Sequence, residues 1–234
     1  MFGYGFYYMD AGYVLVLITA ILSMIASARV SSTFNKFSKK TTARNITGEQ
    51  AARGILDANG LYNVKIESVA GNLTDHYDPR ANVIRLSDTV KNSTSVAAVG
   101  VAAHEAGHAV QHATNYAPIK VRNAIVPVAN IGSTVGPYLI ILGLIFSSFS
   151  FLVDIGIWFF AAAVLFQLVT LPVEFNASRR AVKTLEGDMY IEADEVPAVK
   201  KVLGAAAMTY VAAAAVSIAN LLRFIMLAGR RRDD

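Results

Sequence analysis

The sequence predicts a mainly α-helical membrane protein, with about four transmembrane helices and a small α+β domain that contains a short sheet. Two observations lead to this fold class. The first is composition: 54% of the 234 residues are hydrophobic and only 16% are charged, whereas soluble domains carry about 25% charged residues. The second is the existence of four charge-free runs, each near or above the roughly 18–20 residues that a helix needs to cross a bilayer. These runs are residues 11–28, 123–153, 155–173 and 202–222.

The cysteine count and the charge exclude several classes of protein. The chain has no cysteine, so disulfides and thiolate metal sites are excluded, and any metal must be bound by histidine and carboxylate side chains. The net charge of +4 is concentrated near the ends of the apolar runs, which indicates membrane topology rather than nucleic-acid binding. No basic segment precedes the first run, so we interpret it as a retained span and not as a cleaved signal peptide.

The first part of the chain predicts an interfacial segment, a span and then a short amphipathic helix. Residues 1–10 are rich in aromatic side chains and glycine, which is typical of a membrane–water interface. After the first span, Thr47 and Gln50 stand three residues apart, before the apolar Ile55 and Leu56. This spacing indicates a capping box in which Thr47 is the N-cap of a helix.

Two short strands and a second helix are predicted next. Residues 64–69 alternate between polar and apolar side chains, and residues 82–87 form a second short strand, with turn signals between them. Polar N-cap residues at 92–95 then precede an alanine-rich stretch from Val96 to about Ala113, a composition that favours helix. Its charged and imidazole side chains argue against a fifth span.

This helix carries the pattern His104-Glu105-x-x-His108. Residues four apart on a helix lie on one face, so the two imidazoles can bind one zinc ion, Zn²⁺. The carboxylate between them is then placed to take a proton from water as a general base. We therefore predict His104 and His108 as metal ligands and Glu105 as the catalytic residue.

The order of the spans predicts the third ligand. The second and third spans have a very short connection, so the segment before the second span and the segment after the third lie on the same side of the membrane. The first segment contains the histidine pair, and the second begins with Glu174. Glu174 is therefore the predicted third metal ligand.

Other side chains compete for the third position. Asp75 and His76 lie in the turn region between the two predicted strands. His112 follows His108 by one helical turn, which is too far along the helix axis to share the ion comfortably. We expect His112 to be exposed, or to contact a ligand rather than the metal.

Two other classes of zinc protease do not fit the sequence. A metzincin site would need a histidine where Thr114 stands and a glycine where Gln111 stands. An intramembrane protease of the site-2 type would need the motif inside a span and an aspartate ligand in a later span. Here the motif helix is too polar, and no charge-free run contains an aspartate.

Five segments carry a resemblance to a known family. They are residues 47–52 (TGEQAA), 76–79 (HYDP), 83–87 (VIRLS), 104–111 (HEAGHAVQ) and 172–178 (PVEFNAS). Together they resemble the YugP-like family of neutral zinc metallopeptidases, which are bacterial membrane proteins. The resemblance covers nearly the whole chain and implies a zinc-dependent peptidase, without naming a substrate.

The predicted site is also similar to that of the gluzincin proteases, particularly the membrane-bound HtpX-like group. The third ligand of that group is a glutamate on a later helix, in a Glu-x-x-Ala-Asp pattern, and its aspartate braces a ligand histidine. Glu174 and Ala177 fit this pattern, but Ser178 stands in the position of the aspartate. Ser178 could brace the histidine only as a neutral hydrogen-bond partner.

Basic residues near the span ends predict the orientation. On the side of the motif lie Arg29, Lys36, Lys39, Lys40, Arg44, Lys120, Arg122, Arg179, Arg180, Lys183, Lys200 and Lys201. On the other side lie Arg230, Arg231 and Arg232. The positive-inside rule then predicts a multi-pass protein of the cell (inner or plasma) membrane with its active site facing the cytoplasm.

The expected division of the chain follows from these spans. It consists of residues 1–30 (N-terminal segment and first span), 31–118 (cytoplasmic catalytic region, with the zinc-binding helix at about 95–113), 119–173 (hairpin of the second and third spans), 174–200 (third-ligand helix and acidic loop) and 201–234 (fourth span and basic tail).

The predicted function is that of a gluzincin-like zinc metalloendopeptidase that hydrolyses peptide bonds at the membrane interface. Residues 82–87 are expected to offer a sheet edge on which an extended substrate pairs. The expected partners are a peptide or membrane-protein substrate and the lipid bilayer, and no nucleic acid is expected. The alternative is a non-proteolytic membrane scaffold that keeps a structural zinc site.

Overall fold

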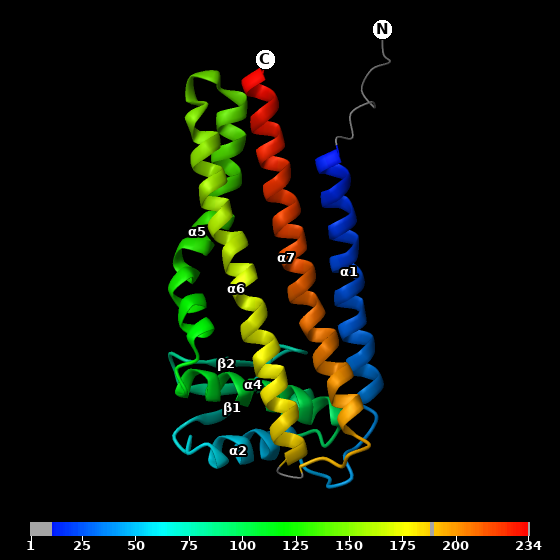
Figure 1. The fold of residues 1–234 in the computed structure, drawn as a ribbon. Helices are drawn as coiled ribbons and strands as arrows, with labels where there is room; N and C mark the ends of the chain where they lie inside the picture. The colour runs from blue at the N-terminus through cyan, green and yellow to red at the C-terminus, as the bar shows by residue number, and fades with distance from the viewer. Residues whose placement is uncertain (1–10, 188–189, 234) are drawn as a thin grey trace. The chain divides into compact units, whose positions relative to one another are not determined.

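The computed structural model describes residues 11–187 and 190–233, so the aromatic segment 1–10 lies outside the described residues. Its elements, shown in Figure 1, are α1 (Ala11–Phe37), α2 (Gly48–Ala58), β1 (Lys65–Val69), β2 (His76–Asp78), β3 (Val83–Ser87), α3 (Asp88–Lys91), α4 (Val96–Ala113), α5 (Ala117–Ile145), η1 (Ser147–Phe149), α6 (Phe151–Gly187) and α7 (Val196–Asp233). Helices dominate, and the strands form one small sheet. The predicted fold class is therefore confirmed.

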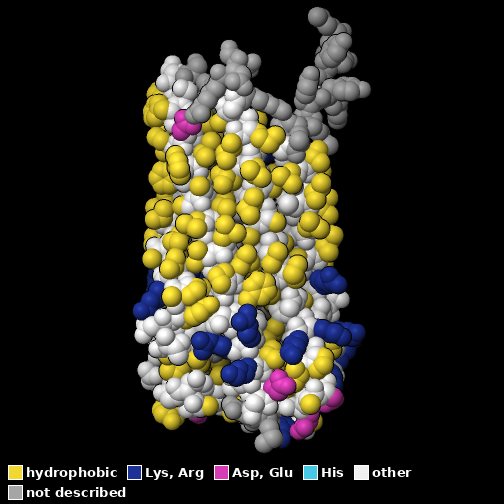
Figure 2. Space-filling model, viewed as in Figure 1, with side chains coloured by type: hydrophobic (Ala, Val, Ile, Leu, Met, Phe, Trp, Pro, Cys, Tyr) yellow, Lys and Arg dark blue, Asp and Glu magenta, His cyan; other side chains and the backbone are white. Residues whose placement is uncertain are grey.

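Among the residues that the structure describes, four helices are long and apolar enough to cross a membrane. They cover Gly12–Phe37, Ala117–Ile145, Phe151–Gly187 and Val196–Gly229. Large hydrophobic side chains on them are exposed, for example Trp158 at 77% and Tyr138 at 65%, and Figure 2 shows hydrophobic side chains over the long helices. Contact with lipid explains why these side chains are exposed on a folded chain.

The chain divides into two compact units. Among the described residues, unit one consists of 11–26, 121–171 and 209–233, and unit two consists of 27–120, 172–187 and 190–208. Within unit one, glycines permit close approach of α5 and α6, because a Cβ atom at Gly132 would overlap the carbonyl oxygen of Phe159. Small residues at such contacts are typical of helix packing in membranes.

Unit two has a conventional apolar core built around α2 and α4. The predicted capping box of α2 is present: Thr47 Oγ1 accepts from the Gln50 amide at 3.2 Å, and Gln50 Oε1 accepts from the Thr47 amide at 2.8 Å. The apolar face of α2, including Ile55 and Leu56, is buried in one cluster with the alanines of α4. The amphipathic pattern of the sequence therefore leads directly to the helix pair that supports the motif.

The sheet differs from the prediction. Its strand order is β1-β3-β2, in which β1 is parallel and β2 antiparallel to β3. The prediction that residues 82–87 present a sheet edge is wrong, because β3 is the central strand and is hydrogen-bonded on both sides. The strand that the sequence did not predict, β2, has only three residues and ends at a turn signal. An alternating pattern cannot be recognised over so short a segment.

Candidate metal centre

Helix α4, which carries the His104-Glu105-x-x-His108 motif, lies largely buried within unit two. Ser95 is its N-cap and accepts a hydrogen bond from the amide of Ala98 at 3.2 Å. The alanines of the helix, such as Ala102 and Ala106, are fully buried. Small side chains let neighbouring elements pack closely around α4, so one face of the helix remains for the polar groups of the motif.

Three side chains of the described residues converge at one point. His104 Nε2 lies 3.2 Å from Glu174 Oε2, His108 Nε2 lies 3.5 Å from the same oxygen, and the two histidine nitrogens are 3.1 Å apart. The two histidine side chains are only 13% and 12% exposed and the glutamate only 3%. The structure therefore brings Glu174 of α6 to the pair of imidazoles on α4.

The far nitrogen of each ring has a partner of its own. Ser178 Oγ lies 3.1 Å from His104 Nδ1, and Gln111 Oε1 lies 3.0 Å from His108 Nδ1. An amide oxygen can only accept, so His108 Nδ1 carries the proton, and Ser178 Oγ can accept from His104 in the same way. Both Nε2 atoms then present lone pairs to the point of convergence. Such partners hold metal-ligating histidines in one tautomer and orientation.

Known proteins with a similar sequence point to the same chemistry. Residues 12–229 match the family model described as "Putative neutral zinc metallopeptidase". The chain belongs to this family. It is also 48% identical over 223 residues to the "Putative membrane protease YugP" of Bacillus subtilis (strain 168), an alignment that covers 95% of this chain and 99% of the relative. No solved structure matches the chain.

The three converging side chains fit the metal of this zinc peptidase family. Zinc in proteins is four-coordinate in most sites, and bonds of about 2.0–2.1 Å to nitrogen and oxygen put two ligands of a tetrahedral ion about 3.3–3.4 Å apart. The three separations here, 3.1, 3.2 and 3.5 Å, lie around that value. Two neutral imidazoles and one carboxylate are a donor set of catalytic zinc sites, which keep a fourth position open.

The electrostatics of the centre favour a cation. Burial alone would lower the pKa of His108, but a hydrogen bond from the protonated ring to Glu174 and the negative charges of Glu105 and Glu174 together raise it. The Glu105 side chain is itself buried, at 8% exposure. Two buried carboxylates beside neutral imidazoles leave negative charge that a divalent cation would balance.

Gln111 is a part of the centre whose role the sequence did not reveal. It is fully buried, and its Nε2 donates to the Val173 carbonyl at 2.8 Å and to Asn176 Oδ1 at 2.9 Å. Its position three residues after His108 on a helix was a usable signal. Its partners on α6 could not be recognised from the sequence, because they lie more than 60 residues away.

The competing ligands lie elsewhere in unit two. Asp75 accepts hydrogen bonds from the amide and hydroxyl of Ser87 at 2.7 and 3.1 Å, and burial raises its pKa against the effect of these bonds. His76 is exposed and bonds the carbonyl of Thr74. The His112 ring is exposed and lies 6.1 Å from the ring of Tyr77. None of these three competitors belongs to the converging group.

The contact between α4 and α6 at this centre requires a glycine. A Cβ atom at Gly107 would lie 2.9 Å from the carbonyl oxygen of Ala177, whereas one at Gly100 would meet only the Val199 side chain, at 3.2 Å. We expect Gly107→Ala to separate the histidines from Glu174 and to lower zinc affinity at least about 10-fold. Competition with a chromophoric chelator measures the affinity.

Gly100→Ala is the matched control for this prediction, because it adds the same methyl group to the same helix. Its zinc affinity should stay close to that of the wild type. Equal affinities for the two variants would contradict the packing argument.

Proposed function

We propose that this chain is a membrane-bound zinc metalloendopeptidase of the gluzincin type. The observation that supports it best is the convergence of His104 Nε2, His108 Nε2 and Glu174 Oε2 at tetrahedral spacing. A bound zinc ion supplies Lewis acidity, which activates water and polarises the peptide carbonyl. In this proposal all three side chains are zinc ligands.

Glu105 moves the proton in this mechanism. It follows the first proposed ligand directly on α4, is buried, and is near enough to His108 for its charge to raise the pKa of that ring, so its carboxylate can accept a proton from the attacking water. The protonated carboxyl group then donates the same proton to the leaving amine. Ser178 and Gln111 keep the two imidazoles in place during this transfer through their bonds to the Nδ1 atoms.

Removal of the metal tests the proposed function. Dialysis of the purified full-length chain against 1,10-phenanthroline should abolish cleavage of an unstructured peptide such as β-casein, and stoichiometric zinc should restore it. Measurement of zinc content in parallel distinguishes the alternative scaffold. A chain that binds one zinc ion tightly and cleaves no peptide in a broad substrate library would contradict the proposal.

The proposal also places the centre on the cytoplasmic face of the cell membrane, with a peptide or a membrane protein as substrate. It is supported by the basic residues that flank the spans on the side of the motif. The chain has no cysteine, so a single introduced cysteine reports one position. Tyr62 of unit two is 75% exposed and is suitable for labelling.

In intact protoplasts, Tyr62→Cys should resist an impermeant maleimide and react only after permeabilisation. Ser148→Cys, in the connection between α5 and α6, should react with the same maleimide in intact protoplasts. Labelling of Tyr62→Cys in intact protoplasts would show that the predicted orientation is wrong, and it would leave the proposed metal chemistry untouched.

A further inference from the structure

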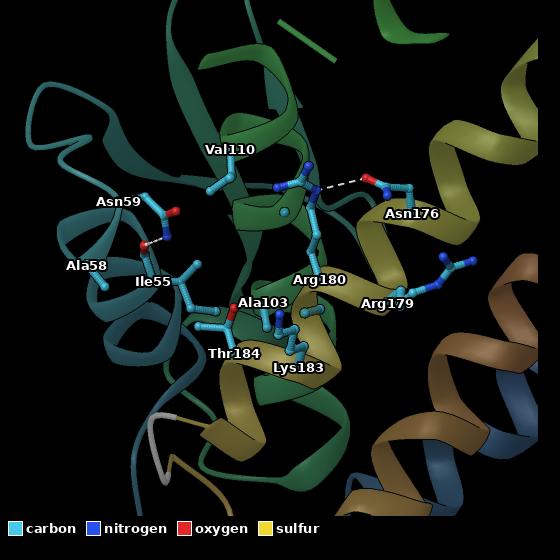
Figure 3. A pocket seen from close by; sticks show the side chains of 12 residues that line it. Ile55, Ala58, Asn59, Ala103, Val110, Asn176, Arg179, Arg180, Lys183 and Thr184 are labelled. Carbon is cyan, nitrogen blue, oxygen red and sulfur yellow. Dashed lines mark hydrogen bonds between the residues drawn. The ribbon is translucent and has the colours of Figure 1, made fainter. Parts of the chain in front are cut away.

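Unit two contains a cavity of about 550 Å³ that the metal centre does not use. Helices α2, α4 and α6 line it, and Figure 3 shows its side chains. Ile55 comes from α2 and Asn59 is the C-cap of that helix, Val110 comes from α4, and Arg180 and Lys183 come from α6. Neither the two histidines nor Glu174 line it, so the cavity is separate from the candidate zinc site.

The polar lining of the cavity is rich in hydrogen-bond donors. No aspartate or glutamate among the residues that the structure describes lines it. Arg180 Nε donates to Asn176 Oδ1 at 2.8 Å, and its guanidinium lies 6.0 Å from the ring centroid of Tyr116. These contacts fix the guanidinium at the cavity that Val110 also lines (Figure 3) and leave its terminal nitrogens as donors. Within the described part of the chain, Lys183 forms no ion pair.

A chain of hydrogen bonds that begins at a backbone carbonyl orients the amide of Asn176. The Val173 carbonyl can only accept, so the atom of Gln111 that faces it is the donor Nε2. The same Nε2 donates to Asn176 Oδ1. Because Asn176 Oδ1 also accepts from Arg180, the Nδ2 group of Asn176 remains as a further donor at the cavity.

We propose that this cavity binds the phosphate group of an anionic phospholipid. A guanidinium, an ammonium and an amide NH₂ group supply donors, and arginine is well suited to phosphate oxygens because its fork of N–H groups can bind two of them. The apolar walls, such as Ile55, Ala103 and Val110, suit the glycerol part of a lipid better than they suit a free, fully hydrated ion. The headgroup phosphate is therefore the expected occupant.

The position of the cavity on α6 supports a lipid as the source of the phosphate. The apolar run of α6 ends at Val173, and Arg180 follows seven residues later in the same helix. Seven residues correspond to about 10 Å along the axis, and the headgroup layer extends about 5–8 Å beyond the hydrocarbon core on each side. An arginine side chain can bridge the remainder, and basic pockets at this level are known to bind anionic headgroups.

Lipid titration of the full-length chain tests the proposal. We would titrate the protein in neutral detergent with phosphatidylglycerol and count bound lipids by native mass spectrometry, for the wild type and for Lys183→Gln, Arg180→Gln and the double variant. Each single change should weaken binding of one lipid about tenfold, because each removes a charged donor. Lys183 is exposed and outside the Asn176 network, so its variant remains informative even if Arg180→Gln disturbs the fold.

The matched control is the double variant Lys65→Gln and Lys201→Gln, which removes the same charge from exposed positions outside the cavity. Its affinity for the lipid should stay within about twofold of the wild type, since neither lysine lines the cavity and charges away from the bound phosphate are screened by salt. Equal losses in the control and in the cavity variants would overturn the site.

Two further outcomes are decisive about the ligand. Binding of inorganic phosphate that depends on Arg180 and Lys183, without such binding of the lipid, would keep the phosphate site and overturn the lipid as its source. The second outcome is that binding of a peptide with a free C-terminus depends on Arg180 and Lys183, whereas binding of its amidated form and binding of phosphatidylglycerol do not. The cavity would then be a site for a peptide carboxylate, and the proposal would be overturned.

Discussion

Replacing Glu105 by glutamine is expected to lower peptide cleavage about 10²–10⁴-fold, the range that a general acid–base group supplies, while zinc content stays at the wild-type level. Glutamine has nearly the same shape but cannot accept a proton. The three converging atoms that are proposed to bind zinc belong to other residues, so the metal should remain. Peptide turnover and metal content, measured on the same preparation, check both halves of the result.

Glu67→Gln serves as the control for this experiment. It makes the same chemical change at a half-exposed glutamate of β1 that pairs only loosely with Arg85, at 3.6 Å. Cleavage by this variant should be unchanged, because exposed ion pairs of this kind contribute little to stability. Full activity of Glu105→Gln would exclude Glu105 as the proton carrier, and loss of zinc in that variant would show that it has a structural role instead.

Replacing Glu174 by alanine is expected to lower zinc affinity by more than about 100-fold and to abolish cleavage. Loss of a group that merely orients a ligand costs 10–100-fold in affinity, and Glu174 is proposed to be a ligand itself. Its removal also leaves two buried imidazoles without their carboxylate. Isothermal titration with zinc, after chelation of the resident metal, measures the change.

The control for Glu174 lies farther along the same helix. Glu186→Ala removes the same charge from an exposed position of α6 and should bind zinc as the wild type does. Normal zinc affinity in Glu174→Ala would mean that the third ligand comes from elsewhere. The turn near Asp75 and His76 would then be the place to search, although its side chains are bound to the sheet in this structure.

Most of the fold was predictable because its signals are local. A charge-free run of about 20 residues can only be stable in a bilayer as a helix, and each of the four runs lies mostly within one long helix. The capping box of Thr47 and Gln50 involves residues three apart. The strand β2 lacked such a signal, and its absence from the prediction led to the wrong assignment of β3 as an edge.

The sequence by itself determined the pair of imidazoles, because the spacing of His104 and His108 has only one consequence on a helix. It also proposed Glu174, from the number of spans between two segments. Only the tertiary structure decided that this glutamate, 70 residues away, lies 3.2 Å from His104, and that Ser178 and Gln111 hold the outer nitrogens of the rings. These contacts depend on how α4 and α6 pack, and distances across such packing follow from the shapes of many side chains together rather than from any local pattern.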